Sequence, residues 1–72
     1  MPLIYGDTGK RYIVQKISKN TQIRQHLSDL GIREGSDVKI ITILSGNMIL
    51  DIMGARIALG KDLVRQIMVR EA

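Results

Sequence analysis

Side chains suited to catalysis are scarce in this chain. It has no cysteine, and His26 is its only histidine. A hydrolytic triad would need His26 as the base for one of four serines, and none of these serines lies in a nucleophile motif. The aspartates fall mostly in turns or at expected helix starts, where Asp forms local hydrogen bonds. The sequence therefore predicts a protein that is not an enzyme.

Metal binding has one weak pair of candidate ligands. His26 and Asp29 are three residues apart in an expected helix, so both side chains would lie on one helix face. A stable site needs three or four converging donors, and two donors do not complete one. No phosphate-binding glycine motif is present either. We expect no resident cofactor, but His26 and Asp29 stay open as weak ligands of Fe²⁺ or another divalent cation, and a metal-sensing or metal-binding small domain remains an alternative function.

The charge of the chain allows acidic partners but does not identify them. The formal net charge is +4 and the basic residues are scattered, so there is no basic arm. Proteins that bind single-stranded nucleic acids stack bases on aromatic side chains, and only Tyr5 and Tyr12 are available here. Tyr12 shares a strand face with Val14, which predicts a core position. We expect no nucleic-acid partner, although a basic small-barrel nucleic-acid-binding module remains an alternative.

Length and hydropathy indicate one small domain over residues 1–72. Such a short chain buries only about 60% of the surface that its unfolded form exposes. No apolar run approaches the roughly 20 residues that cross a bilayer, and the N-terminal residues show no signal-peptide pattern. The expected location is the cytoplasm, without membrane insertion.

One helix and several short strands would position these residues. A strand is expected over 11–18 and a helix over about 20–31, capped by Asn20 or Thr21 and ended by Gly31. Further strands are expected over 37–44, 48–53, 57–59 and 67–69, with a Gly46-Asn47 turn in the hairpin and a short helical turn over about 61–66. These elements predict a mostly β protein, a small and partly closed antiparallel barrel with one inserted helix.

A motif in the helix and the following turn resembles a known family. Leu27-Ser28-Asp29-Leu30-Gly31-Ile32 followed by Gly35-Ser36-Asp37-Val38 is similar to the L-x-x-L-G-[IF]-x-x-G-x-x-[VI] signature of the FeoA family. Members are small cytosolic partners of the bacterial ferrous-iron transporter FeoB. The resemblance extends over essentially the whole chain, with one departure: Tyr5 precedes Gly6, where many members have proline.

The resemblance implies a fold and a function. The fold would be an SH3-like barrel with an inserted helix. The function would be accessory or regulatory in ferrous iron uptake, through binding to the cytoplasmic, GTPase-containing part of a FeoB-type transporter. The same fold forms a domain of iron-dependent repressors, but this chain shows no DNA-binding helix-turn-helix.

The helix and its following turn are the hypothesised docking face for this partner. Arg24 and Arg33 would be charges at its rim, which mainly affect association rate and salt sensitivity. Alternatively, the leucines only seat the helix on the barrel and the glycine only ends it. Self-association also stays open, because the strand at 37–44 has two partly apolar faces. The hypothesised contact residues are Arg24, Leu27, Leu30, Gly31, Ile32 and Arg33.

Overall fold

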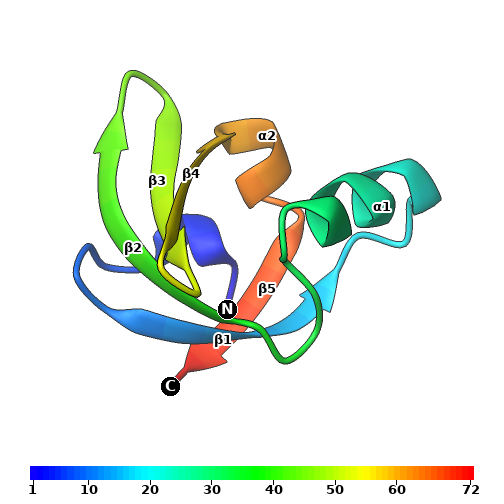
Figure 1. The fold of residues 1–72 in the computed structure, drawn as a ribbon, viewed down its shortest axis with the longest axis horizontal. Helices are drawn as coiled ribbons and strands as arrows, with labels where there is room; N and C mark the ends of the chain where they lie inside the picture. Colours follow the sequence, from blue (N-terminus) through cyan, green and yellow to red (C-terminus); the bar gives the residue numbers. More distant parts are fainter.

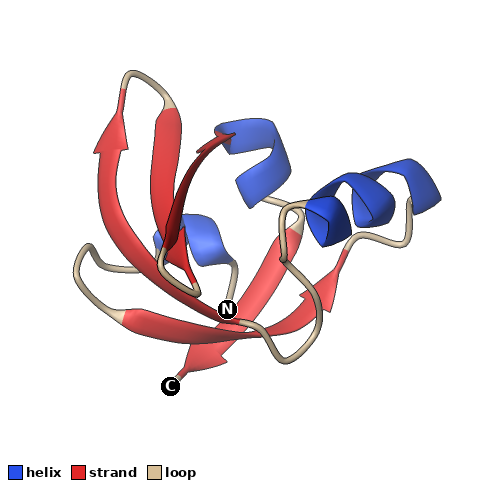
Figure 2. Cartoon of the chain, in the orientation of Figure 1, coloured by secondary structure: helices blue, strands red, loops and turns tan.

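The computed structural model describes residues 1–72 and contains five strands and three short helices (Figures 1 and 2). In chain order the elements are the 3-10 helix η1 (Leu3–Tyr5), β1 (Arg11–Ile17), α1 (Thr21–Asp29), β2 (Asp37–Leu44), β3 (Asn47–Ile52), β4 (Ala55–Gly60), α2 (Lys61–Val64) and β5 (Ile67–Glu71). None of the helices has the length and apolar character that crossing a membrane requires.

The five strands form one antiparallel sheet in the order β4-β3-β2-β1-β5. The register shifts between Val14 and Lys16 in β1 and between Ile40 and Thr42 in β2, and such bulges bend a sheet. β4 and β5 are the two edges and do not pair with each other, so the barrel stays partly open. The expected mostly β, SH3-like barrel with an inserted helix is confirmed. In Figure 1, α1 lies to one side of the sheet, away from the tip of the β2–β3 hairpin.

The core is entirely apolar, because every fully buried side chain is hydrophobic. Tyr12 is 1% exposed, and its hydroxyl accepts a hydrogen bond from the main-chain N–H of Asp7 at 2.8 Å. Leu3 brings η1, an element that the sequence did not predict, into the same core. The core residues are Leu3, Tyr12, Val14, Leu27, Ile32, Val38, Ile40, Met48, Leu50, Ile52, Leu59, Val64, Ile67 and Val69.

α1 follows its local sequence signals closely. Asn20 is the N-cap, and its Oδ1 accepts hydrogen bonds from the N–H groups of Gln22 and Ile23 at 2.9 and 3.1 Å. Gly31 has φ 90°, as expected for a residue that ends a helix. The helix is shorter than the predicted 20–31, because the Asn20 backbone is extended and the regular helix ends at Asp29.

Other predicted boundaries need small corrections. The positive φ angles of the β2–β3 turn are at Ser45 and Gly46, not at Gly46 and Asn47, so Asn47 begins β3. β4 and β5 extend beyond the predicted 57–59 and 67–69, because main-chain pairing continues through polar and exposed residues. α2 ends at Val64, two residues before the predicted end at 66.

Candidate partner-binding site

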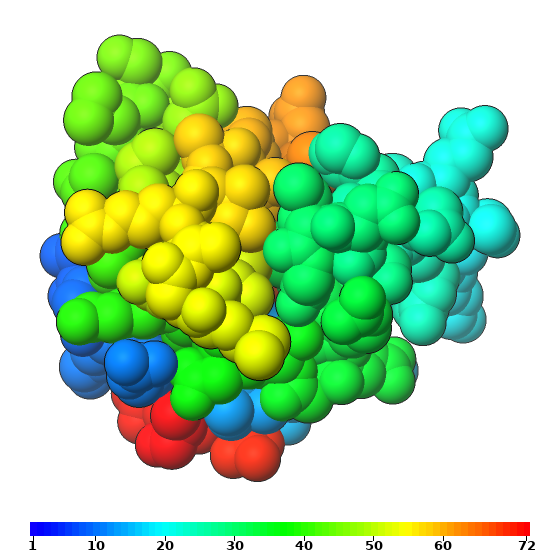
Figure 3. All heavy atoms as spheres, viewed as in Figure 1, coloured from blue at the N-terminus to red at the C-terminus, as the bar shows by residue number.

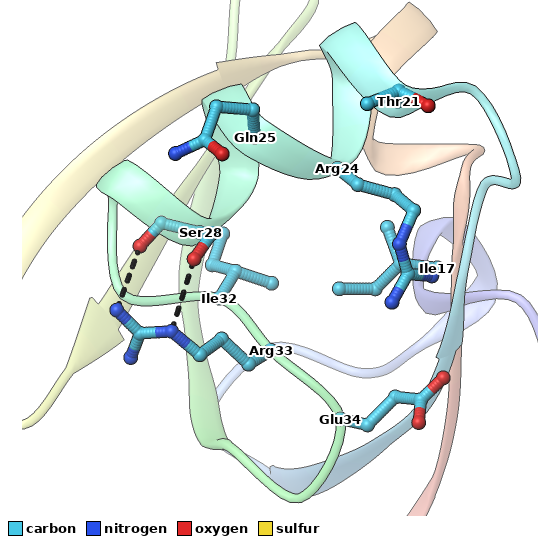
Figure 4. A pocket seen from close by; sticks show the side chains of 8 residues that line it. All are labelled: Ile17, Thr21, Arg24, Gln25, Ser28, Ile32, Arg33 and Glu34. Carbon is cyan, nitrogen blue, oxygen red and sulfur yellow. Dashed lines mark hydrogen bonds between the residues drawn. The ribbon is translucent and has the colours of Figure 1, made fainter.

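A groove of about 460 Å³ lies between α1 and the loop that follows it (Figure 4). Polar and charged side chains form most of its walls, and two isoleucines lie at its base. Its lining residues are Ile17, Thr21, Arg24, Gln25, Ser28, Ile32, Arg33 and Glu34. The groove therefore includes both arginines that the sequence placed at the rim of the docking face.

The two arginines enter the groove from different elements and are held differently. Arg24 projects from α1, and its Nη1 donates a long hydrogen bond of 3.5 Å to the main-chain oxygen of Ser18. Arg33 projects from the loop and donates from Nε and Nη2 to Oγ and the main-chain oxygen of Ser28, at 3.0 and 3.1 Å. Arg33 thus gives the Ser28 carbonyl a second donor besides the N–H of Gly31 and fixes the loop to α1, whereas Arg24 is held only weakly.

Neither groove arginine has an ion-pair partner within 4.0 Å. Other basic residues of the chain do have acidic partners: Nη1 of Arg11 lies 3.3 Å from Oδ1 of Asp37. The pKa of Lys10 is raised above its ordinary value, chiefly by the nearby carboxylate of Glu71 and then by that of Asp7. Glu34 is the one acidic residue that lines the groove. Two guanidinium groups against one carboxylate leave the groove with an excess of positive charge.

The apolar residues of the hypothesised docking face point inward. Leu27 and Ile32 are each 0% exposed, and the N–H of Ile32 donates to the oxygen of Leu27 at 2.8 Å. Leu30 is partly buried against the core. Leu27 and Ile32 therefore expose no side-chain surface in this structure and serve to seat α1 on the barrel, with Ile32 buried beneath the base of the groove. The exposed part of the hypothesised face consists of Arg24 and Arg33.

His26 and Asp29 are both exposed, and no hydrogen bond joins them. The Oδ1 of Asp29 instead accepts a hydrogen bond from Nε2 of Gln25 at 2.8 Å. No group of three or more His, Cys, Asp or Glu side chains comes together anywhere in the chain. The structure thus supplies no third ligand beside these two residues.

Met53 is a surface feature that the sequence reasoning missed. Its side chain is 97% exposed, and it lies in the turn between β3 and β4 with φ 53°. The preceding residue, Ile52, lies near Gly31, two residues past α1: a Cβ on Gly31 would lie 3.6 Å from Ile52 Cγ2. In Figure 3 the yellow atoms of this turn region adjoin green atoms of the segment that follows α1. The sequence signal that could have indicated this turn is Gly54, because two-residue hairpin turns usually end in glycine, as Asn-Gly or Asp-Gly, and here Met53 takes the place of Asn or Asp.

The fold defines the class of protein: a small SH3-like β barrel with one inserted helix. Residues 1–71 match the FeoA domain, and the chain belongs to the FeoA family. It is 37% identical over 71 residues to a protein of Methanocaldococcus jannaschii named "Putative Fe(2+) transport protein A", covering 99% of this chain and 87% of the relative. The family and this relative connect the protein with ferrous iron transport and with accessory transport proteins rather than known enzymes.

Solved structures agree with this assignment. The crystal structure of an iron uptake regulatory protein (FeoA) superposes with a TM-score of 0.91 at 30% identity, covering 100% of this chain and 96% of that one. A manganese-dependent transcriptional repressor in complex with manganese gives a TM-score of 0.92 at 22% identity, covering 100% of this chain but only 36% of the repressor. The repressor shares the fold alone, as one part of a longer chain.

Proposed function

We propose that this protein is a non-enzymatic accessory protein of ferrous iron uptake that acts in the cytoplasm. Its partner is the cytoplasmic, GTPase-containing part of a FeoB-type membrane transporter, and the contact includes the groove beside α1. The observation that carries this proposal is the pair of exposed, unpaired guanidinium groups of Arg24 and Arg33, in a chain that belongs to the FeoA family.

Arginine is suited to this role because its planar fork can bind a carboxylate through two parallel hydrogen bonds. Arg33 already uses Nε and Nη2 toward Ser28, but Nη1 remains available. Arg24 has only its long bond to Ser18, so it can reorient toward a partner. An acidic surface on the transporter domain would complement both side chains and would be guided to them by electrostatic attraction.

Charge reversal at the groove tests the proposal. Replacing both arginines, Arg24→Glu and Arg33→Glu, should weaken binding to the purified transporter cytoplasmic domain at least about tenfold, equivalent to roughly 1.4 kcal/mol. Isothermal titration calorimetry at fixed salt measures the affinity. Arg33→Glu also removes two hydrogen bonds to Ser28, so circular dichroism must show that the double variant stays folded at the assay temperature.

A matched control separates the groove from net charge. Lys61 and Arg70 are exposed and belong to no ion pair, and they do not line the groove. Reversing both to Glu changes the net charge from +4 to 0, by two units at each site, as the groove variant does. The control should bind more tightly than the groove variant. Equal affinities for the two variants would reject the groove as the contact face.

A further inference from the structure

Met53 is the most exposed large hydrophobic residue of the chain. Its side chain is 97% exposed, compared with 75% for Tyr5 and 58% for Leu44. The side chain therefore makes almost no contribution to the core. Packing within the monomer therefore does not explain why this position holds a methionine.

The backbone at Met53 also disfavours methionine. Met53 and Gly54 have φ angles of 53° and 86°, which define a two-residue hairpin turn between the paired residues Ile52 and Ala55. In such turns the first position favours Asn, Asp or Gly, because a longer L side chain is strained at positive φ. Asp51 Oδ1 accepts a hydrogen bond from the N–H of Gly54 at 3.0 Å and so holds the turn. Neither packing nor backbone conformation favours Met53, whereas strained and fully exposed residues often have a functional role.

The turn lies beside the segment after α1, which forms one wall of the basic groove. Ile52 lies near Gly31 in the segment that follows α1, where a Cβ on Gly31 would be 3.6 Å from Ile52 Cγ2, and Arg33, two residues later, is fixed to Ser28 of the helix. Figure 3 shows the turn region and the segment after α1 side by side on one face. A partner that covers the groove would therefore reach the turn through a continuous surface, and the unpaired arginines specify that the partner is acidic there.

We infer that Met53 is an apolar anchor that inserts into an apolar pocket on the cytoplasmic part of the transporter, next to the acidic surface that meets the groove. This inference rests on the proposed function. A methionine side chain is flexible and polarizable, and it adapts to irregular apolar pockets. The rigid turn presents it in a fixed position, which lowers the ordering cost of binding. Anchors of this kind carry much of the affinity of an interface, while the surrounding charges contribute mostly to rate and specificity.

The decisive variant is Met53→Asn, because it should move stability and binding in opposite directions. Asn suits the left-handed position, so the melting temperature should rise, whereas affinity for the transporter cytoplasmic domain should fall about tenfold or more. Met53→Leu keeps an apolar side chain and should bind within about threefold of the natural chain. Ser45→Asn is the matched control: Ser45 has φ 49° in the other two-residue turn, at the hairpin tip that lies away from α1 in Figure 1. It should also raise the melting temperature but leave affinity unchanged.

The outcomes distinguish this inference from the proposed function. If the natural chain does not bind the transporter domain, the proposed function is wrong and the anchor is wrong with it. If the natural chain binds and Met53→Asn binds equally well, only the anchor is overturned. A Met53→Asn variant that melts at a lower temperature would likewise overturn it, by showing that Met53 serves the fold. Raised stability together with lost affinity, and retained affinity for Met53→Leu, would support it.

Discussion

The core around Gly6, near the N-terminus, is packed too closely to accept an added side-chain atom at that residue. Gly6 has φ −70° and ψ 159°, an extended conformation that any residue adopts, so its backbone does not require glycine. The surroundings do: a Cβ there would lie 2.6 Å from Ile40 Cδ1 and 3.0 Å from Tyr12 Cε2. Both neighbouring side chains are buried in the core and cannot move aside freely.

Gly6→Ala should therefore destabilise the protein by about 1–3 kcal/mol, the usual cost of overpacking a core. Urea unfolding measures the change in free energy of unfolding. Gly60→Ala is the control, because Gly60 has nearly the same backbone angles, φ −65° and ψ 154°, and the nearest atom to its added Cβ would be 3.7 Å away. Gly60 is also the N-cap of α2, where Ala is less favourable than Gly, so Gly60→Ala should cost less than about 1 kcal/mol. Similar losses for both variants would show that crowding around Gly6 is not the reason for its glycine.

Which residues could be predicted from the sequence depends on how local their signal is. Tyr12 and Val14 were correctly placed in the core because alternation in a strand marks one face as apolar. Arg24 and Arg33 were correctly expected at the surface. Met53 was missed because an apolar residue next to a strand looks like more strand, and only the pairing of β3 with β4 places it in the turn. Leu3 was missed because the three-residue run Leu3–Tyr5 after proline is too short to show a periodicity.

Among the elements, α1 is the one whose stability depends most on the hydrogen bonds at its two ends. It is only nine residues long, and helices of that length are marginal in water without caps or tertiary packing. Leu27 is its one fully buried residue, so the helix has a small apolar contact with the barrel. The Asn20 cap and the Arg33 bonds to Ser28 therefore matter more to α1 than such bonds would to a helix buried along a whole face.

Asn20→Ala should remove about 1 kcal/mol of stability, because two N–H groups of the first turn lose their acceptor. For a domain of this size that corresponds to a fall of roughly 4–8 °C in melting temperature. Thr21→Ala, one residue later, is the control, because the Thr21 side chain makes no capping bond and is exposed. A Thr21→Ala loss as large as that of Asn20→Ala would contradict the assignment of Asn20 as the cap.

The difference between local signals and long-range strand pairing also explains which element boundaries could be predicted. α1 is flanked by residues with strong local preferences, Asn20 and Gly31, so its position could be predicted within two residues. β4 is an edge strand with exposed residues such as Ala55 and Arg56, and its length is set by its pairing with β3 rather than by an apolar pattern. The turn before β3 was shifted by one residue, because Ser45 takes the positive φ that Asn47 seemed better suited to adopt.

In the proposed complex, the net charge and the shape of the whole molecule would have different roles. The net charge of +4 lies on a small barrel whose Cα radius of gyration is 10.7 Å, so the molecule as a whole carries a net positive field. The groove adds local positive charge beside α1, and Met53 adds an apolar tip on the adjoining surface. In that proposed complex the field would act during approach, whereas the groove and the tip would act once the two surfaces touch.

The association rate with the transporter cytoplasmic domain should therefore depend on salt more than the dissociation rate does. Raising ionic strength from about 0.05 to 0.5 M shortens the Debye length to a few ångströms and should slow association by about tenfold, measured by stopped-flow fluorescence. The Arg24→Glu, Arg33→Glu variant should lose more of this salt dependence than the Lys61→Glu, Arg70→Glu variant, although both have a net charge of 0. Met53→Asn should keep the full salt dependence and change only the dissociation rate. If the two charge variants lost it equally, net charge alone would steer the encounter and the groove would have no separate role in it.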